Sequence, residues 1–135
     1  MRIPKLILQD RDFNQIELLM MKLASGEMDF VDGHYVMTAL DGESYCIVAA
    51  LEGWILNFAT MAKRAGVDYD DRPMVQLKNK LASGMMLTKS DIEQARKVVD
   101  VQLRLYQSLP SETISSVAVT TQIKLLQPHQ KGAAA

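Results

Sequence analysis

The sequence of 135 residues predicts a mainly α fold: a four-helix bundle-like domain of two helical hairpins, with short β segments near the termini and after the first helix. Apolar residues recur at helical spacing in four segments, and glycine or proline follows each of them. The hydrophobic fraction of 48% is enough for one core. We expect a single globular domain over residues 1–126 and a flexible tail over residues 127–135.

The N-terminal part is predicted to contain an arm, a helix and a hairpin. Residues 2–8 are apolar and include a proline, which is typical of an edge strand or an extended arm. A capping box at Asp12 and a stop signal at Gly26 predict a helix from Asp12 to Ala24. Asp32-Gly33 between two short apolar runs predicts a tight β-hairpin, because its turn needs positive φ at both central residues.

The most apolar segment, from Glu43 to Ala65, is predicted to form the central helix. It is apolar on nearly every face, so we expect the rest of the chain to surround it. Asp41 is the expected cap at its start, and Gly66 marks its end. A shorter helix is expected to begin near Pro73 and to end at Gly84.

A longer helix is predicted to follow, capped by Thr88 or Ser90 and reaching about Leu109. This helix carries two apolar stripes and therefore needs two neighbours. One stripe consists of Ile92, Ala95, Val99 and Tyr106, and the other of Val98, Val101, Leu105 and Leu109. The neighbour of the second stripe is either another subunit or a further helix of the same domain.

Beyond Ser111 the pattern changes to strand periodicity. Apolar or β-branched residues alternate with other residues from Val117 to Leu125, which predicts a C-terminal strand. We expect this strand to pair with the N-terminal arm or with the same strand of a partner chain, because an isolated strand leaves its backbone groups unpaired.

The net charge of −1 conceals an uneven distribution. Residues 12–61 contain eight acidic side chains and one lysine, a net charge of −7, whereas residues 62–131 contain eleven basic and seven acidic side chains, a net charge of +4. This asymmetry favours two halves that face each other, or a molecule that pairs with itself or with a charged partner.

One heptapeptide occurs twice with six identical positions: KLASGEM at residues 22–28 and KLASGMM at residues 80–86. Both copies close an apolar helix, where lysine complements the helix dipole and glycine takes the left-handed conformation. The alternative interpretation is duplication of a helical hairpin.

The sequence shows no catalytic, metal or cofactor signature, so we expect a non-enzymatic protein. His34 is predicted to flank a turn, and Cys46 to be a buried, unreactive thiol. Glu52, inside the apolar helix, is a candidate acid of raised pKa if it is buried. The acidic residues 68–71 lack the glycine and glutamate of a calcium loop and are better explained as helix caps.

Residues 58–84 offer a hypothesis of DNA binding. Met61 to Val67 resembles the end of the first helix and the turn of a helix-turn-helix unit, with Met74 to Leu81 as the second helix. The resemblance implies a transcriptional regulator in which the candidate DNA-binding residues are Lys63, Arg64, Lys78 and Lys80. The acidic residues of the turn would repel phosphates.

The favoured function is a small regulatory or adaptor protein that forms a homodimer and binds another protein. Nine methionines favour an adaptable apolar surface, although they also fill cores. The candidate partner-binding residues are Val98, Val101, Leu105, Leu109, Met85 and Met86. A single cysteine and the absence of a leader predict a cytoplasmic location, and no apolar stretch is long enough for a membrane span.

Overall fold

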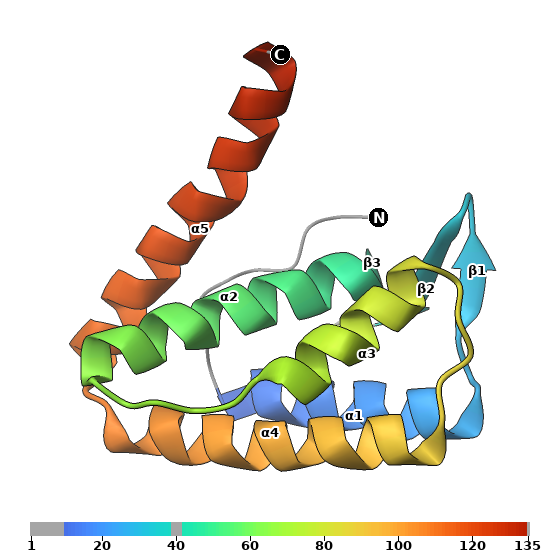
Figure 1. The fold of residues 1–135 in the computed structure, drawn as a ribbon, viewed down its shortest axis with the longest axis horizontal. Helices are drawn as coiled ribbons and strands as arrows, with labels where there is room; N and C mark the ends of the chain where they lie inside the picture. The colour runs from blue at the N-terminus through green and yellow to red at the C-terminus, as the bar shows by residue number, and fades with distance from the viewer. Residues whose placement is uncertain (1–9, 39–41, 135) are drawn as a thin grey trace.

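The computed structural model describes residues 10–38 and 42–134, with side chains over 13–38, 42–121 and at 123. The described chain is mainly helical, with five helices and a small three-stranded antiparallel sheet (Figure 1). The elements in order are α1 (Asp10–Ser25), β1 (Asp29–Val31), β2 (His34–Thr38), β3 (Ser44–Cys46), α2 (Ile47–Ala65), α3 (Arg72–Ala82), α4 (Lys89–Ser108) and α5 (Ser111–Ala134). The predicted arm at residues 2–8 lies outside the described residues.

The hairpin predicted after the first helix is confirmed. β1 pairs antiparallel with β2, and the turn residues Asp32 and Gly33 have φ of 51° and 80°, as this turn requires. β3 adds to the other side of β2, with Tyr45 opposite Met37. The predicted start of the central helix at Glu43 is therefore wrong, because residues 44–46 pair with the sheet first. The expected cap, Asp41, lies outside the described residues.

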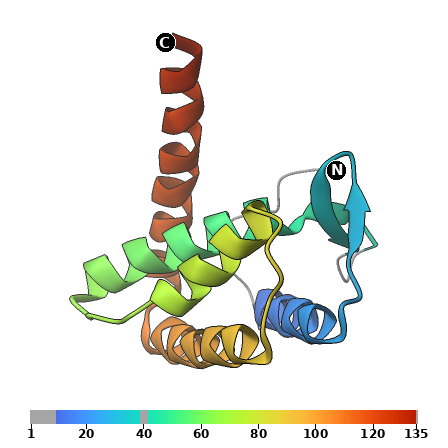
Figure 2. The same ribbon diagram turned by 45° about the vertical axis from the view of Figure 1, so that its right-hand side comes forward.

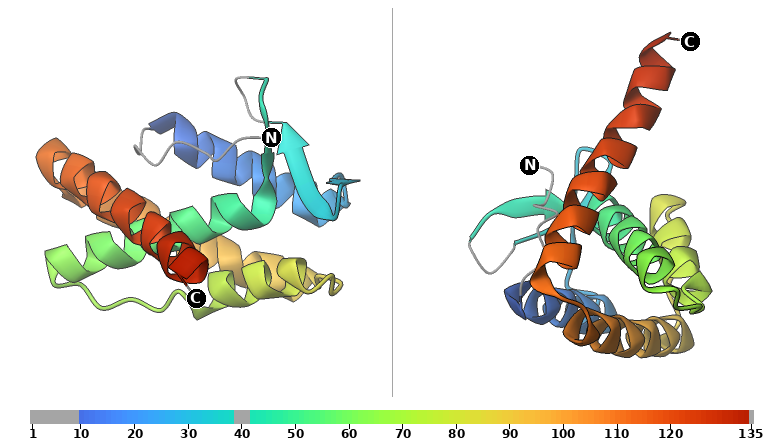
Figure 3. Two further views of the ribbon diagram at one scale, coloured as in Figure 1. Left: turned by 90° about the horizontal axis from the view of Figure 1, so that it is seen from above. Right: turned by 90° about the vertical axis from the view of Figure 1, so that its left-hand side faces the viewer.

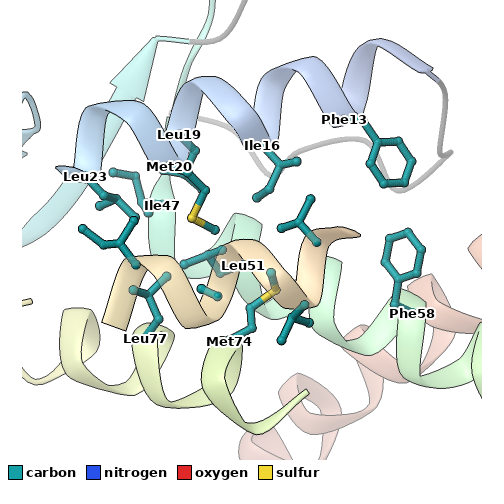
Figure 4. Close-up of a cluster of buried hydrophobic side chains, with 14 of the residues drawn as sticks. Phe13, Ile16, Leu19, Met20, Leu23, Ile47, Leu51, Phe58, Met74 and Leu77 are labelled. Atoms are coloured by element: carbon teal, nitrogen blue, oxygen red, sulfur yellow. The ribbon is translucent and has the colours of Figure 1, made fainter. Parts of the chain in front are cut away.

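The core forms where α1, α2, α3 and α4 meet. Figure 4 shows one side of it, in which Ile16 and Met20 of α1 face Leu51 of α2 and Met74 of α3. These four side chains are at most 6% exposed. The prediction that α2 is the central helix is confirmed, since it packs against the sheet, α3, α4 and α5.

Aromatic rings close one end of this core. Phe13 of α1 contacts Trp54, Phe58 and Tyr106, with ring centroids 5.1, 5.9 and 5.1 Å apart. Edge-on and tilted contacts of this kind add to the stability that burial alone gives. Because the three partners come from α2 and α4, these contacts fix α1 against both helices.

The repeated heptapeptide corresponds to two equal helix ends. Gly26 and Gly84 have φ of 73° and 71°. In each case the glycine N–H and the next N–H donate to carbonyl groups of the last helical turn, the pattern of a Schellman motif. A shared capping requirement therefore accounts for the likeness without a duplication.

The starts of α3 and α4 agree with the predictions from the sequence. The packing of the helices agrees with them only in part. The capping box of Thr88 with Asp91 is present at the start of α4. α3 runs back along α2, while α4 packs against both α3 and α1 (Figures 1 and 2). The predicted bundle of four helices in two hairpins is not confirmed, because α1 leads into the sheet and a fifth helix is present.

The prediction of a C-terminal strand is wrong. Residues 117–125 lie within α5, a helix of 24 residues that also includes most of the predicted tail. Val117, Ala118 and Thr121 are at most 3% exposed, at the i, i+1 and i+4 spacing of one helix face, and this face packs on α2. Figure 3 shows that the second half of α5 extends away from the body.

Candidate protein-interaction surface

The second apolar stripe of α4 is not an open binding surface. Val98 and Leu105 are 4% and 6% exposed and belong to the core of this chain. Leu109 is half-buried against the same core, and Val101 is also half-buried. This correction to the predicted partner-binding set has a simple cause: α4 has α1 on one side and α3 on the other, so both stripes are covered within the domain.

Two of the predicted partner-binding residues do lie on the surface. Met85 and Met86, in the loop between α3 and α4, are 57% and 90% exposed. They follow the Schellman motif at Gly84, which turns the chain out of α3. The loop holds these thioethers in solvent, where long unbranched side chains adapt to irregular partners.

Two further apolar side chains, which the sequence analysis did not select, are exposed on β1. Phe30 and Val31 are 63% and 48% exposed, on an edge strand of the sheet. Phe30 rests partly on Tyr35 of β2, with ring centroids 5.0 Å apart. Their exposure could have been predicted from their position beside the Asp32-Gly33 turn, because the tip of a short two-stranded hairpin has little core to cover its apolar residues.

The hairpin and the α3–α4 loop lie at the same end of the molecule, beside the C-terminal turn of α1 (Figures 1 and 2). We use the name hairpin end for this end of the molecule, where Phe30 and Val31 are exposed on the hairpin and Met85 and Met86 on the loop. Three exposed acidic residues, Glu27, Asp29 and Asp32, surround its β-hairpin part. The hairpin end therefore combines exposed apolar side chains with local negative charge.

The four candidate DNA-binding residues are not collected on one free surface. The Arg64 guanidinium donates to the hydroxyl groups of Ser116 and Thr120 on α5. Lys80 Nζ donates to both carboxylate oxygens of Asp91, at 2.9 and 2.8 Å. Both cations are thus engaged within the chain.

The other two candidates, Lys63 and Lys78, lie on α2 and α3, exposed and half-buried respectively. The two helices run in opposite directions side by side, joined by residues 66–71 (Figure 2). The second helix of a helix-turn-helix unit instead crosses the first after a shorter turn. These contacts weigh against DNA recognition by residues 58–84.

The acidic loop before α3 is organised by an arginine. Asp70 accepts two hydrogen bonds from the Arg72 guanidinium, both at 2.8 Å, and one from the Arg72 backbone N–H at 3.0 Å. Hydrogen bonds from Arg72 lower the pKa of Asp70 to about 2. Asp70 thus accepts from the first residue of α3, whereas Asp71, which occupies the N-cap position, makes no capping hydrogen bond through its side chain.

A polar network crosses the buried interface between α2 and α4. Trp54 Nε1 donates to Gln102 Oε1 at 2.6 Å, and Gln102 Nε2 donates to the Tyr69 hydroxyl at 3.5 Å. Gln102 is fully buried, and burial also raises the pKa of Tyr69. Since the network satisfies the polar groups that packing encloses, it explains how the 66–71 connection is held against the core.

The candidate catalytic or metal-binding side chains Glu52, His34 and Cys46 lie on three different elements, α2, β2 and β3. Glu52 is exposed, contrary to what a buried acid would require, and His34 is exposed beside the turn. Cys46 is half-buried at the end of β3 and precedes the first residue of α2. Across residues 13–38 and 42–121, no three His, Cys, Asp or Glu side chains are grouped as metal ligands would be.

Comparisons with known proteins found no matching family model, curated protein or solved structure. Within the described part of the chain, no helix combines the length and apolar character needed to cross a membrane.

Proposed function

We propose that this chain is a non-enzymatic regulatory or adaptor protein that self-associates and binds a second protein through its hairpin end. The observation that carries this proposal is the exposure of Phe30, Val31, Met85 and Met86 at one end of a molecule whose other large apolar residues mostly enter the core. Exposed apolar side chains that gather in one region are characteristic of protein-binding surfaces.

The shape of the hairpin end fits a protein ligand better than a small molecule. The four apolar residues protrude from a hairpin and a loop, whereas small-molecule sites are concave. A flat or grooved protein surface would therefore be the natural complement.

Local charge narrows the chemistry of the partner. Glu27, Asp29 and Asp32 place three carboxylates within six residues of one another, next to Phe30 and Val31. Complementary charge speeds association and excludes wrong partners. We therefore expect the partner to present apolar side chains flanked by lysine or arginine.

A titration followed by methionine methyl NMR tests this proposal. The probe is a helical peptide of leucine and lysine, and its matched control carries glutamate in place of lysine. We expect the lysine peptide to shift the methyl signals of Met85 and Met86 while those of the buried Met61 and Met74 stay unchanged. The glutamate peptide should shift neither pair.

The Phe30→Ser variant provides the control within the chain. Because Phe30 is 63% exposed, the variant should fold normally and bind the lysine peptide several-fold more weakly. Equal shifts with both peptides would remove the role of the acidic residues. No shift at Met85 and Met86 with either peptide would remove the hairpin end as a protein-binding surface.

A further inference from the structure

Most of the methionines whose side chains the structure describes fall into two groups that differ sharply in exposure. Those of the first group are at most 3% exposed and lie in the core: Met20, Met37, Met61 and Met74. Those of the second group are 58%, 57% and 90% exposed: Met21, Met85 and Met86. Because a thioether on the surface meets dissolved reagents and one in the core does not, we expect the two groups to differ in reactivity.

Met85 and Met86 are adjacent residues of the open loop between α3 and α4. Among the large apolar side chains that the structure describes, Met86 is the most exposed. A side chain added at Gly84, the residue before this pair, would meet no atom within 4 Å. The chain returns to the core at Leu87, which is half-buried against it. Both sulfur atoms of the pair are therefore accessible to a small reagent in the solvent.

The chemistry open to an exposed thioether is oxidation by a peroxide. The sulfur gives an electron pair to one peroxide oxygen, so that an S–O bond forms while the O–O bond breaks. The second oxygen takes up the proton and leaves as water or as an alcohol. The sulfur loses two electrons, the peroxide gains two, and the product is methionine sulfoxide. Since the reaction needs contact between sulfur and peroxide, we expect exposure to set the relative rates.

Oxidation makes the side chain polar, and this change affects an interface more than the free protein. In the free protein Met85 and Met86 face the solvent, so water can hydrate the new oxygen. An apolar interface would remove that water without supplying a hydrogen-bond donor, which costs free energy. Oxidation of methionine also disrupts interfaces that rely on its flexible apolar side chain. We therefore expect oxidation of this pair to weaken binding without lowering stability.

We propose that Met85 and Met86 form an oxidation-sensitive modification site. A peroxide converts their thioethers to sulfoxides, and the loss of apolar surface releases the protein bound at the hairpin end. The release step rests on the proposed function, because it requires a partner at the hairpin end. The position of the modification site does not depend on a partner, since it follows from the exposure of the two sulfur atoms.

Tandem mass spectrometry after brief treatment of the full chain with dilute hydrogen peroxide tests the position of the site. We expect Met86 to gain an oxygen atom fastest and Met85 to follow at a rate similar to that of Met21, while the buried Met61 and Met74 stay unmodified. The urea midpoint should be the same before and after treatment. Equal rates at exposed and buried methionines, or protection of Met85 and Met86, would overturn the inference.

Fluorescence anisotropy of the labelled lysine peptide tests the release step, with the peroxide removed before each titration. We expect the oxidised wild type to bind the peptide at least tenfold more weakly than the untreated wild type. The double variant Met85→Leu with Met86→Leu keeps apolar side chains that peroxide does not oxidise, so its affinity should not change on treatment. Met21→Leu is the matched control, because it removes a thioether about as exposed as Met85 and should stay as sensitive as the wild type.

The outcomes separate the release step from the proposed function. Unchanged affinity of the oxidised wild type, or weaker binding by the oxidised double variant, would overturn the release step. If the untreated wild type fails to bind the lysine peptide, the proposed function is refuted and the release step with it. The mass spectra still decide where oxidation occurs, because they are recorded without a partner.

Discussion

Replacing Thr121 by valine removes one buried hydroxyl group at the contact between α5 and α2. Valine keeps the shape of the side chain, but Asn57 Oδ1 loses its donor at 3.2 Å in a site closed to water. Leaving a buried polar group unsatisfied costs about 1–3 kcal/mol. We therefore expect Thr121→Val to lower the free energy of unfolding by that amount, whereas Thr121→Ser keeps the hydroxyl and loses only a methyl group.

Urea unfolding monitored by circular dichroism and by the fluorescence of Trp54 measures this change. With a slope of about 2 kcal/mol per molar urea, the midpoint should fall by roughly 0.5–1.5 M. Ser115→Ala, on the exposed side of α5, is the matched control and should change stability by less than about 0.5 kcal/mol. Equal midpoints for the wild type and Thr121→Val would refute the docking of α5 on α2.

Three further outcomes follow from the structure. Hydrogen bonds from Lys80 and Thr88 lower the pKa of Asp91, so the stability that its carboxylate contributes is present above the unfolded pKa of about 3.9 and is lost as the pH falls through the folded pKa. The difference in urea midpoint between the wild type and Asp91→Asn should therefore narrow from pH 6 to pH 2.5. A difference that stays constant over this range would contradict the prediction. Gly84→Ala should cost about 1–2 kcal/mol in the same assay because φ is 71°, and a neutral effect would count against the Schellman motif. Duplex DNA should show no binding that falls steeply with salt, whereas such binding, abolished by Lys78→Ala with Lys80→Ala, would revive the DNA-binding hypothesis.

The sequence predicted best those features that depend on local backbone geometry. Gly66 and Gly84 end helices, and the Asp32-Gly33 turn closes a hairpin, because each of these conformations needs positive φ. The cap at Thr88 was also predictable, since its hydroxyl and the Asp91 carboxylate satisfy backbone groups within a few residues. Signals of this kind do not depend on the rest of the fold.

The errors came from patterns that fit more than one period. The β-branched residues from Val117 to Ile123 alternate like a strand, yet Val117 and Thr121 also share one helical face. Packing of that face on Asn57 and Arg64 of α2, far away in the sequence, favours the helix. Such long-range contacts override local propensity, and no local window contains them.

The candidate site could be predicted only in part, because some of its features follow from local signals and others depend on long-range packing. Met85 and Met86 lie beside a recognisable helix stop, so their exposure follows from a local signal. Val98 and Leu105 were assigned to a partner because a second apolar stripe needs a neighbour, and the sequence does not say whether that neighbour is internal. α1 and α3 supply it within the domain.

The central claim is that the hairpin end contacts another protein, and site-specific photo-crosslinking tests it most directly. A photoreactive amino acid is placed at Met86 or, as a control, at the exposed Gln76 of α3, in the full chain within the cells that produce it. We predict a discrete cross-linked product from position 86 and none from position 76, with the product lost when Phe30→Ser is added. Identical patterns from both positions, or no product from position 86, would contradict the claim.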